Sequence, residues 1–210
     1  MKFGNIIEDI LGHKSKIKVL RYLLNTKLEL TGRQLSRTVG IHHRTVHEAL
    51  KELASFGVVV MHQTGKAVIY KINNNNLLVE KILKPIFELE RNLLSQTIAT
   101  ILKKIHFRII SVIVFGSVAS STERGTSDMD ALFLVSSKKE KPKLEEFFQK
   151  IEYDFMLRYG NMLSPLVLTI DEFYRRLKQK DNLIQNIIHK GKSVYGKTVQ
   201  EVLVECRRRK

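Results

Sequence analysis

The sequence of 210 residues predicts an α+β protein with two domains, and three observations support this expectation. Hydrophobic residues make up 43% of the chain, which is enough for packed cores and excludes general disorder. Segments with apolar residues at helical spacing alternate with short β-rich runs. Four asparagines at 73–76 form a low-complexity break, and asparagine favours turns over helices and strands. We therefore predict a first domain over residues 1–76, a helical linker over 77–105 and a second domain over 106–210.

The first domain is predicted to contain helices followed by a β-hairpin. A helix is expected after Ser15, a plausible N-cap, because apolar residues recur there at helical spacing. Thr31 and Gln34 have the spacing of a capping box, and Gly40 is suited to end the helix that follows. Further along, the expected elements are a helix over 42–55 and two strands over 58–63 and 67–72.

The second domain is predicted to hold a sheet that helices cover. The strand expected over 128–135 has apolar residues on both of its faces, which indicates a strand inside a covered sheet. Pro85 is expected to interrupt the preceding helical region. The other expected elements are helices over 77–83, 86–105, 144–159, 172–178 and 183–189, and strands over 109–115 and 163–169.

Composition excludes several classes of protein. The single cysteine, Cys206, excludes a disulfide framework and a cysteine-based structural zinc site. No apolar run approaches the ~18 residues that a membrane span needs, and the first residues do not have the pattern of a secretory signal, so we expect a cytoplasmic protein. The net charge of +15 suggests a polyanionic partner. The basic excess is densest before the asparagine run, where 12 Lys and Arg oppose five Asp and Glu.

The third helix of the first domain has a basic outer face. Val46 and Leu50 belong to its apolar stripe, whereas the opposite side and the tip of the hairpin carry His43, Arg44, His47, Lys51 and Lys66. From Lys14 to Ile72 the chain resembles a winged helix-turn-helix. That resemblance implies that the third helix enters the major groove of DNA and that Lys66 reaches the flanking backbone. We therefore expect duplex DNA as a partner.

A second motif lies in the C-terminal domain. Gly116 and Ser117 follow a buried strand, and such a turn offers backbone N–H groups and a hydroxyl to a phosphate. Asp128 and Asp130 stand two apart on the next expected strand, so both side chains should lie on one face. Two carboxylates on an otherwise apolar strand fit a divalent cation, because Mg²⁺ combines a few carboxylates with the phosphates of a substrate.

These residues resemble the minimal nucleotidyltransferase family, which has the polymerase-β-like fold. Gly116, Ser117, Asp128 and Asp130 match the motif at the expected spacing, and Ser127 matches the residue before the acidic pair. The resemblance spans about Leu93 to Gly196 and implies a mixed sheet flanked by helices. It also implies that Gly116, Ser117 and Ser127 bind nucleotide, that the two aspartates are catalytic, and that they hold Mg²⁺ or Mn²⁺ with an NTP as ligand or substrate.

The chain departs from the family's pattern at two places. The family has a third carboxylate on the next core strand, and the strand expected over 163–169 has none. Ser120 and Ser121 replace a frequent Arg-Gly pair that contacts phosphate. Both departures predict that the domain binds nucleotide with reduced transfer activity, and they leave open whether the chain is an enzyme.

Three functions fit the sequence. The leading one is a DNA-binding transcriptional regulator whose second domain binds nucleotide and a divalent cation. The alternative is an active nucleotidyltransferase that moves NMP from an NTP–Mg²⁺ complex to a hydroxyl of a protein, an RNA or a small molecule. In a third, the first domain is a protein-docking surface. Because proteins that read palindromic sites are usually two-fold symmetric, we expect a homodimer held by the helices of residues 77–105.

Overall fold

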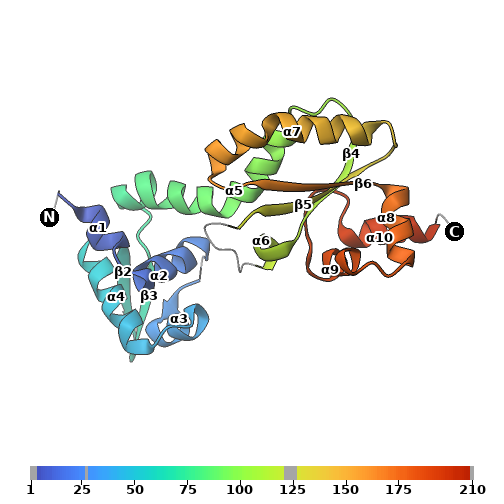
Figure 1. Cartoon of the computed structure of the whole chain (residues 1–210). Coiled ribbons are helices and arrows are strands. Elements are labelled where there is room, and N and C mark those ends of the chain that lie inside the picture. The colour runs from blue at the N-terminus through green and yellow to red at the C-terminus, as the bar shows by residue number, and fades with distance from the viewer. Residues whose placement is uncertain (1–3, 27, 121–126, 209–210) are drawn as a thin grey trace. The chain divides into compact units, whose positions relative to one another are not determined.

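The computed structural model describes residues 4–26, 28–120 and 127–208, and the chain divides into two compact units, Met1–Asn92 and Leu93–Lys210 (Figure 1). Each unit has its own apolar core and combines helices with a sheet. The predicted α+β fold class is confirmed. No helix in the described part of the chain is long and apolar enough to cross a membrane.

The first unit is a winged helix. Its antiparallel sheet has the strand order β1-β3-β2, and Thr64 pairs with Ala67, so the hairpin between β2 and β3 turns through two residues. Four helices, α1 to α4, share one apolar core with this sheet, and the apolar side of α4 faces it. The elements are α1 Ile6–Leu11, α2 Lys14–Asn25, β1 Leu30–Thr31, α3 Gly32–Val39, α4 His43–Ser55, β2 Val59–Thr64 and β3 Ala67–Ile72.

Local signals placed both ends of α3 correctly, whereas α1 and the short strand β1 had not been predicted. Thr31 accepts a hydrogen bond from the N–H of Gln34, whose side chain accepts one from the N–H of Thr31, so the predicted capping box is present. Gly40 ends α3 with a φ of 64°, as expected for a left-handed C-cap. The expectation for Ser15 was wrong. Helix α2 already begins at Lys14, which places Ser15 inside the first turn.

The predicted interruption at Pro85 was also wrong. The π-helical turn Val79–Leu83 runs directly into α5, Lys84–Leu102, and Pro85 is the second residue of that helix. The N–H of Lys84 donates to the carbonyl oxygen of Val79, five residues back. This wider turn carries the chain past Pro85, which has no N–H to donate, without leaving the helical conformation.

The second unit is built on a mixed four-stranded sheet with the order β6-β5-β4-β7. Strands β5 and β6 are parallel, and β4 is antiparallel to both of its neighbours. The short strand β7 and helix α10 had not been predicted. The elements after α5 are β4 Ile109–Val114, α6 Gly116–Ser120, β5 Met129–Val135, α7 Glu140–Tyr159, β6 Leu163–Thr169, α8 Ile170–Lys178, α9 Asn182–Lys190, β7 Lys192–Gly196 and α10 Val199–Arg208.

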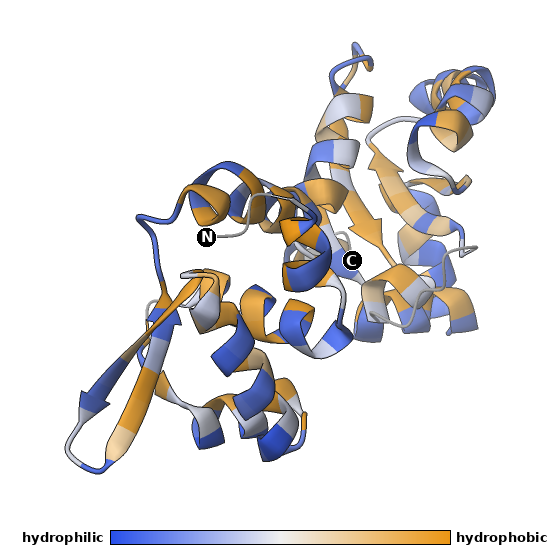
Figure 2. Cartoon of the chain, turned by 90° about the vertical axis from the view of Figure 1, so that its left-hand side faces the viewer, coloured by the Kyte–Doolittle hydropathy of each residue, from blue (hydrophilic) through white to orange (hydrophobic). Residues whose placement is uncertain are grey.

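Helices cover both faces of this sheet, as predicted. Alternate residues of β5 belong to different cores: Ala131 and Phe133 pack with α5 and α7, whereas Leu132 and Leu134 pack with α8, α9 and α10. In Figure 1, α7 lies on one side of the strands and α6 and α9 lie on the other. Figure 2 shows how apolar the central strands of this unit are. Asp130 lies two residues before Leu132 and therefore belongs to the face covered by α6 and α9.

Candidate functional site

Gly116 is held directly against Asp130. The N–H of Phe115 donates to the carbonyl oxygen of Asp130 at 3.0 Å, and α6 begins at the next residue. Gly116 has a φ of 69°, in the left-handed region that favours glycine. A Cβ atom built on Gly116 would overlap with Oδ2 of Asp130 and would lie 3.2 Å from its Cγ. The position therefore requires glycine both for its conformation and for the approach of the carboxylate.

Asp128 and Asp130 form an acidic pair at the start of β5. Asp130 is half-buried inside the strand, whereas Asp128 is exposed and stands immediately before it, since β5 begins at Met129 and not at Asp128 as predicted. Burial raises the pKa of Asp130, and the negative charge of Asp128 raises that pKa further. The two carboxylates are therefore close enough to repel each other.

Neither carboxylate of the pair has a partner in the described part of the chain. No hydrogen bond or ion pair from those residues reaches the side chain of Asp128 or Asp130. Two adjacent carboxylates that no basic side chain neutralises suit a hard divalent cation, whose coordination shell phosphate oxygens would complete. The residues present thus fit the metal that the sequence implied.

The predicted nucleotide-binding residues surround this pair in the chain. Gly116 and Ser117 open α6, and Ser127 directly precedes Asp128. The hydroxyl of Ser120 donates to the carbonyl oxygen of Gly116 at 3.0 Å, so it stabilises α6 itself. Ser121 lies outside the described residues.

Strand β6 supplies no third carboxylate. In the parallel register Asp130 is paired with Ser164, and Leu132 is paired with Leu166. Glu172, further along the chain, accepts a hydrogen bond from the N–H of Thr169 in a capping box and forms an ion pair with Lys141 at 3.1 Å. Within residues 4–26, 28–120 and 127–208, no group of three or more His, Cys, Asp and Glu side chains is placed to hold a metal.

The basic face of the first unit is exposed. The predicted DNA-contacting side chains of α4 all lie on its solvent side, opposite the buried Val46, Leu50 and Leu53. Lys66 is exposed in the two-residue turn between β2 and β3. Arg33 and Arg37, on the exposed side of α3, add two cations that sequence reasoning had not included.

One acidic residue modifies this face. Nε of Arg44 is 3.1 Å from a carboxylate oxygen of Glu48, one helical turn further along α4. Sequence reasoning missed this ion pair, although its signal was the spacing of four residues. Arg44 remains 84% exposed, so the pair neutralises part of its charge without burying it.

Comparison with known proteins identifies the second unit. The family described as "Polymerase beta, Nucleotidyltransferase" matches residues 96–200, which is half of the chain and includes both aspartates of the pair. The chain belongs to this nucleotidyltransferase family. No curated protein matches the sequence.

Three solved structures resemble parts of the chain, each with a TM-score below 0.4. A toxin–antitoxin with AMP-PNP is 16% identical, with a TM-score of 0.39, covering 55% of this chain and 85% of that one. A homodimeric winged helix-turn-helix DNA-binding domain from Mycobacterium bovis is 18% identical, with a TM-score of 0.33 and coverages of 49% and 83%. A possible transcriptional regulator from Methanosarcina mazei Go1 is 20% identical, with a TM-score of 0.33 and coverages of 48% and 94%.

Proposed function

We propose that this member of the nucleotidyltransferase family is a dimeric DNA-binding regulator whose second unit binds an NTP together with a divalent cation. The observation that carries the nucleotide half is the acidic pair, in which Asp130 lies against Gly116 and beside Asp128, and no basic side chain of the described residues pairs with either carboxylate. The DNA half is supported by the winged-helix fold with its exposed basic face on α4.

In this proposal Asp128 and Asp130 hold the cation, Mg²⁺ or Mn²⁺. Bound there, the cation would neutralise charge on the NTP phosphates. Gly116 leaves room for the carboxylate of Asp130. The hydroxyls of Ser117 and Ser127, which both precede the acidic pair in the chain, would contact phosphate oxygens. Binding should be weaker in acid, because burial favours the protonated form of Asp130, which is a poor cation ligand.

The missing third carboxylate supports binding with reduced transfer. Two-metal phosphoryl transfer needs enough negative charge for both ions and a group that takes the proton of the acceptor hydroxyl. Asp128 and Asp130 supply one pair of ligands. The residue beside Asp130 on β6 is Ser164, so this strand adds no carboxylate there.

The nucleotide half is tested by ligand-induced stabilisation. A ligand that binds only the folded state raises the melting temperature by mass action, so ATP with Mn²⁺ should raise it by several degrees. The double variant Asp128→Asn with Asp130→Asn should lose this shift. A control with Glu145→Gln and Glu152→Gln removes the same charge from α7 and should keep it. An equal shift in the aspartate double variant would show that the acidic pair is not the site.

The DNA half is tested by binding to duplex fragments at several salt concentrations. Neutralising phosphates releases counterions, so the affinity should fall steeply as salt rises. Arg44→Ala should weaken a specific site by about 1–3 kcal/mol if Arg44 reads a base, whereas Lys66→Ala should weaken all duplexes about equally. Undetectable binding to a pool of genomic fragments at low salt would exclude this half of the proposal and favour a protein-docking role for the winged helix.

The alternative is an active transferase, and membership of the family favours it. NMP would then pass from the NTP to a hydroxyl of a protein, an RNA or a small molecule, with the winged helix as the substrate-binding module. Incubation with α-labelled NTP, Mg²⁺ and cell extract distinguishes the two functions, because only the transferase moves label to an acceptor.

A further inference from the structure

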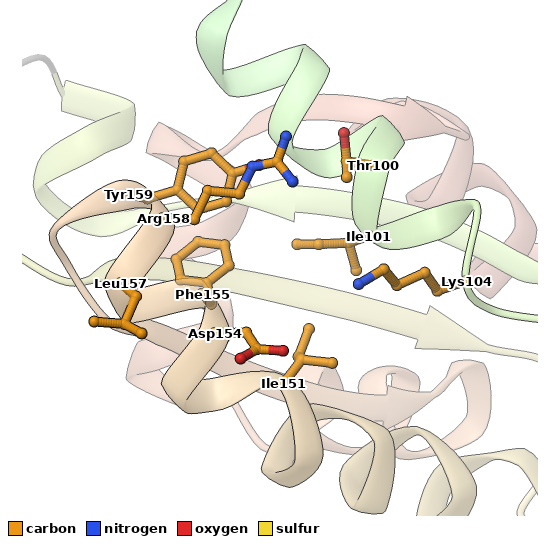
Figure 3. Close-up of a pocket in the computed structure, with 9 residues that line it drawn as sticks. All are labelled: Thr100, Ile101, Lys104, Ile151, Asp154, Phe155, Leu157, Arg158 and Tyr159. Carbon is orange, nitrogen blue, oxygen red and sulfur yellow. The ribbon is translucent and has the colours of Figure 1, made fainter.

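A groove between α5 and α7 is separate from the acidic pair. It has a volume of about 380 Å³ and is lined by the last turns of α5 and the C-terminal half of α7, both in the second unit (Figure 3). These helices pack on the face of the sheet that carries Ala131 and Phe133, whereas Asp130 belongs to the opposite face. A nucleotide held by the acidic pair therefore does not fill this groove.

The floor of the groove is apolar and continues onto an exposed surface. Ile101 and Phe155 are buried beneath it, with Ile151 beside them. Leu157, on the rim, is 65% exposed, and Tyr153, one turn earlier on α7, is also 65% exposed. An open groove flanked by exposed large apolar side chains indicates a surface that another macromolecule covers.

Three charged side chains on the rim have no partner of opposite charge. Figure 3 shows Lys104, in the turn that follows α5, and both Asp154 and Arg158 on α7 around the groove. None of the three forms an ion pair with a described residue. Arg158 lies instead over the ring of Tyr159, with its Cζ 5.8 Å from the ring centroid.

A neighbouring pair on the same helix behaves differently. Glu146 and Lys150 have the same spacing of four residues on α7, and they form an ion pair of 2.7 Å. Asp154 and Arg158 have that spacing and do not pair. Their charges are therefore available to groups outside this chain.

The two signs of charge determine which occupant fits. A purely acidic partner would match Lys104 and Arg158 but would repel Asp154. A two-fold interface between identical surfaces places residue i against residue j and residue j against residue i. Two antiparallel copies of α7 crossing near residue 156 would bring Asp154 of each copy opposite Arg158 of the other and would cover the exposed leucines.

We propose that the groove between α5 and α7 is the surface through which two copies of this chain dimerise, with reciprocal Asp154–Arg158 ion pairs. This inference rests on the dimer included in the proposed function and assigns it to particular residues. The dimer surface is then formed by α7 together with the C-terminal end of α5, and not by α5 alone.

Charge exchange tests the proposal, with the dissociation constant of the full-length dimer measured by analytical ultracentrifugation. Asp154→Arg and Arg158→Asp should each raise that constant about tenfold, because each places like charges opposite one another. The double variant, which carries both substitutions, should restore it to within about threefold of the wild-type value, since opposite charges face each other again.

Matched controls come from α8, on the other face of the sheet. Asp171→Arg and Arg175→Asp make the same changes of charge at the same spacing and should leave the constant unchanged. A monomer at about 100 µM, single exchanges without effect, or a double exchange as weak as the single ones would each overturn the proposed surface. DNA binding by the same proteins is measured separately. A dimer unaffected by the exchanges would overturn only the assignment of the dimer surface to the groove, whereas wild-type protein that does not bind DNA would overturn the proposed role as a DNA-binding regulator.

Discussion

The carboxylate of Asp130 occupies the space in which a side chain at Gly116 would begin. The contact follows from the antiparallel register of β4 and β5, in which Val114 pairs with Ala131 and the N–H of Phe115 donates to the carbonyl oxygen of Asp130. The turn into α6 therefore begins beside the second acid of the pair. This arrangement explains in steric terms why the two parts of the motif belong together, although 13 residues separate them in the sequence.

Gly116→Ala should both destabilise the second unit and abolish nucleotide binding. The methyl group overlaps with Oδ2 of Asp130, so either the turn or the carboxylate must move, and the positive φ adds strain. We expect a loss of about 2–3 kcal/mol in the free energy of unfolding. Chemical denaturation measures this loss, and the melting temperature with ATP and Mn²⁺ measures the loss of binding.

Gly160→Ala separates the two causes. Gly160 has a φ of 79° at the end of α7, and a Cβ there would have no atom within 4 Å. This variant should lose only about 1 kcal/mol and should keep the ligand-induced shift. If the two alanine variants were equally unstable and bound nucleotide equally well, the contact with Asp130 would have no role.

Asp130→Asn should stabilise the protein in the absence of metal at pH 7. Burial and the charge of Asp128 raise the pKa of Asp130, so ionising this group costs more in the folded than in the unfolded state. Its contribution to stability therefore falls as the pH rises from the ordinary value of 3.8 through the raised pKa. In EDTA we expect a melting temperature roughly 2 °C higher for the variant at pH 7.

The pH dependence of that difference is the decisive measurement. Glu140 and Glu172 have lowered pKa values, so their contributions rise with pH and oppose that of Asp130 in the total. Subtracting the wild-type melting temperature from that of the variant at each pH removes these shared contributions. The difference should be near zero in strong acid and should grow as Asp130 ionises; a constant difference at all pH values would contradict the prediction.

Some features that depend on neighbouring residues in the chain could be predicted, although the cap expected at Ser15 was wrong, whereas pairings between distant segments could not. The capping box at Thr31 and the C-cap at Gly40 are local, and the sequence sufficed for both. Strand β7 has no buried residue, so its pattern carries little signal, and it forms because β4 offers it an edge. The helical passage through Pro85 depends on a π turn that no residue pattern indicated.

The candidate site shows the same division. Motif spacing was sufficient to select Gly116, Asp128 and Asp130, but their contact depends on the register of β4 and β5. Sequence alone could not predict the register in which β5, the strand of Asp130, pairs with β6. The parallel register now places Ser164 beside Asp130, and Leu166, two residues on, lies on the same side of the sheet.

Glu48→Gln should strengthen binding of duplex DNA. The substitution releases Arg44 from its ion pair and removes a negative charge from the exposed face of α4. We expect an affinity about three- to tenfold higher at moderate salt, measured by fluorescence anisotropy. In an Arg44→Ala background the same substitution should gain less, because only the repulsion remains to be removed. An unchanged affinity would place α4 away from the DNA.

Ser164→Asp should raise transfer activity, because it adds a carboxylate to the strand on which the resemblance to the family implies a third one. The parallel register pairs Ser164 with Asp130, so an acid at 164 would join the acidic pair on the same side of the sheet. Ser164 is exposed, and the substitution should therefore be tolerated, whereas Leu166 packs against the core beside Leu132 and an acid there should destabilise the unit.

The comparison of Ser164→Asp with Ser164→Asn isolates the charge. Only the aspartate adds a ligand for a second cation and a group that can take the proton of the acceptor hydroxyl. We expect label transfer from α-labelled ATP with Mg²⁺ to rise at least tenfold over wild type in the aspartate variant and to stay at the wild-type level in the asparagine variant. Removing Asp128 as well should cancel the gain, since an acid at 164 works only beside the existing pair. Wild-type protein that transfers label at about 1 s⁻¹ or faster would show that the missing carboxylate does not limit the reaction, and the active transferase would then replace the nucleotide-binding regulator.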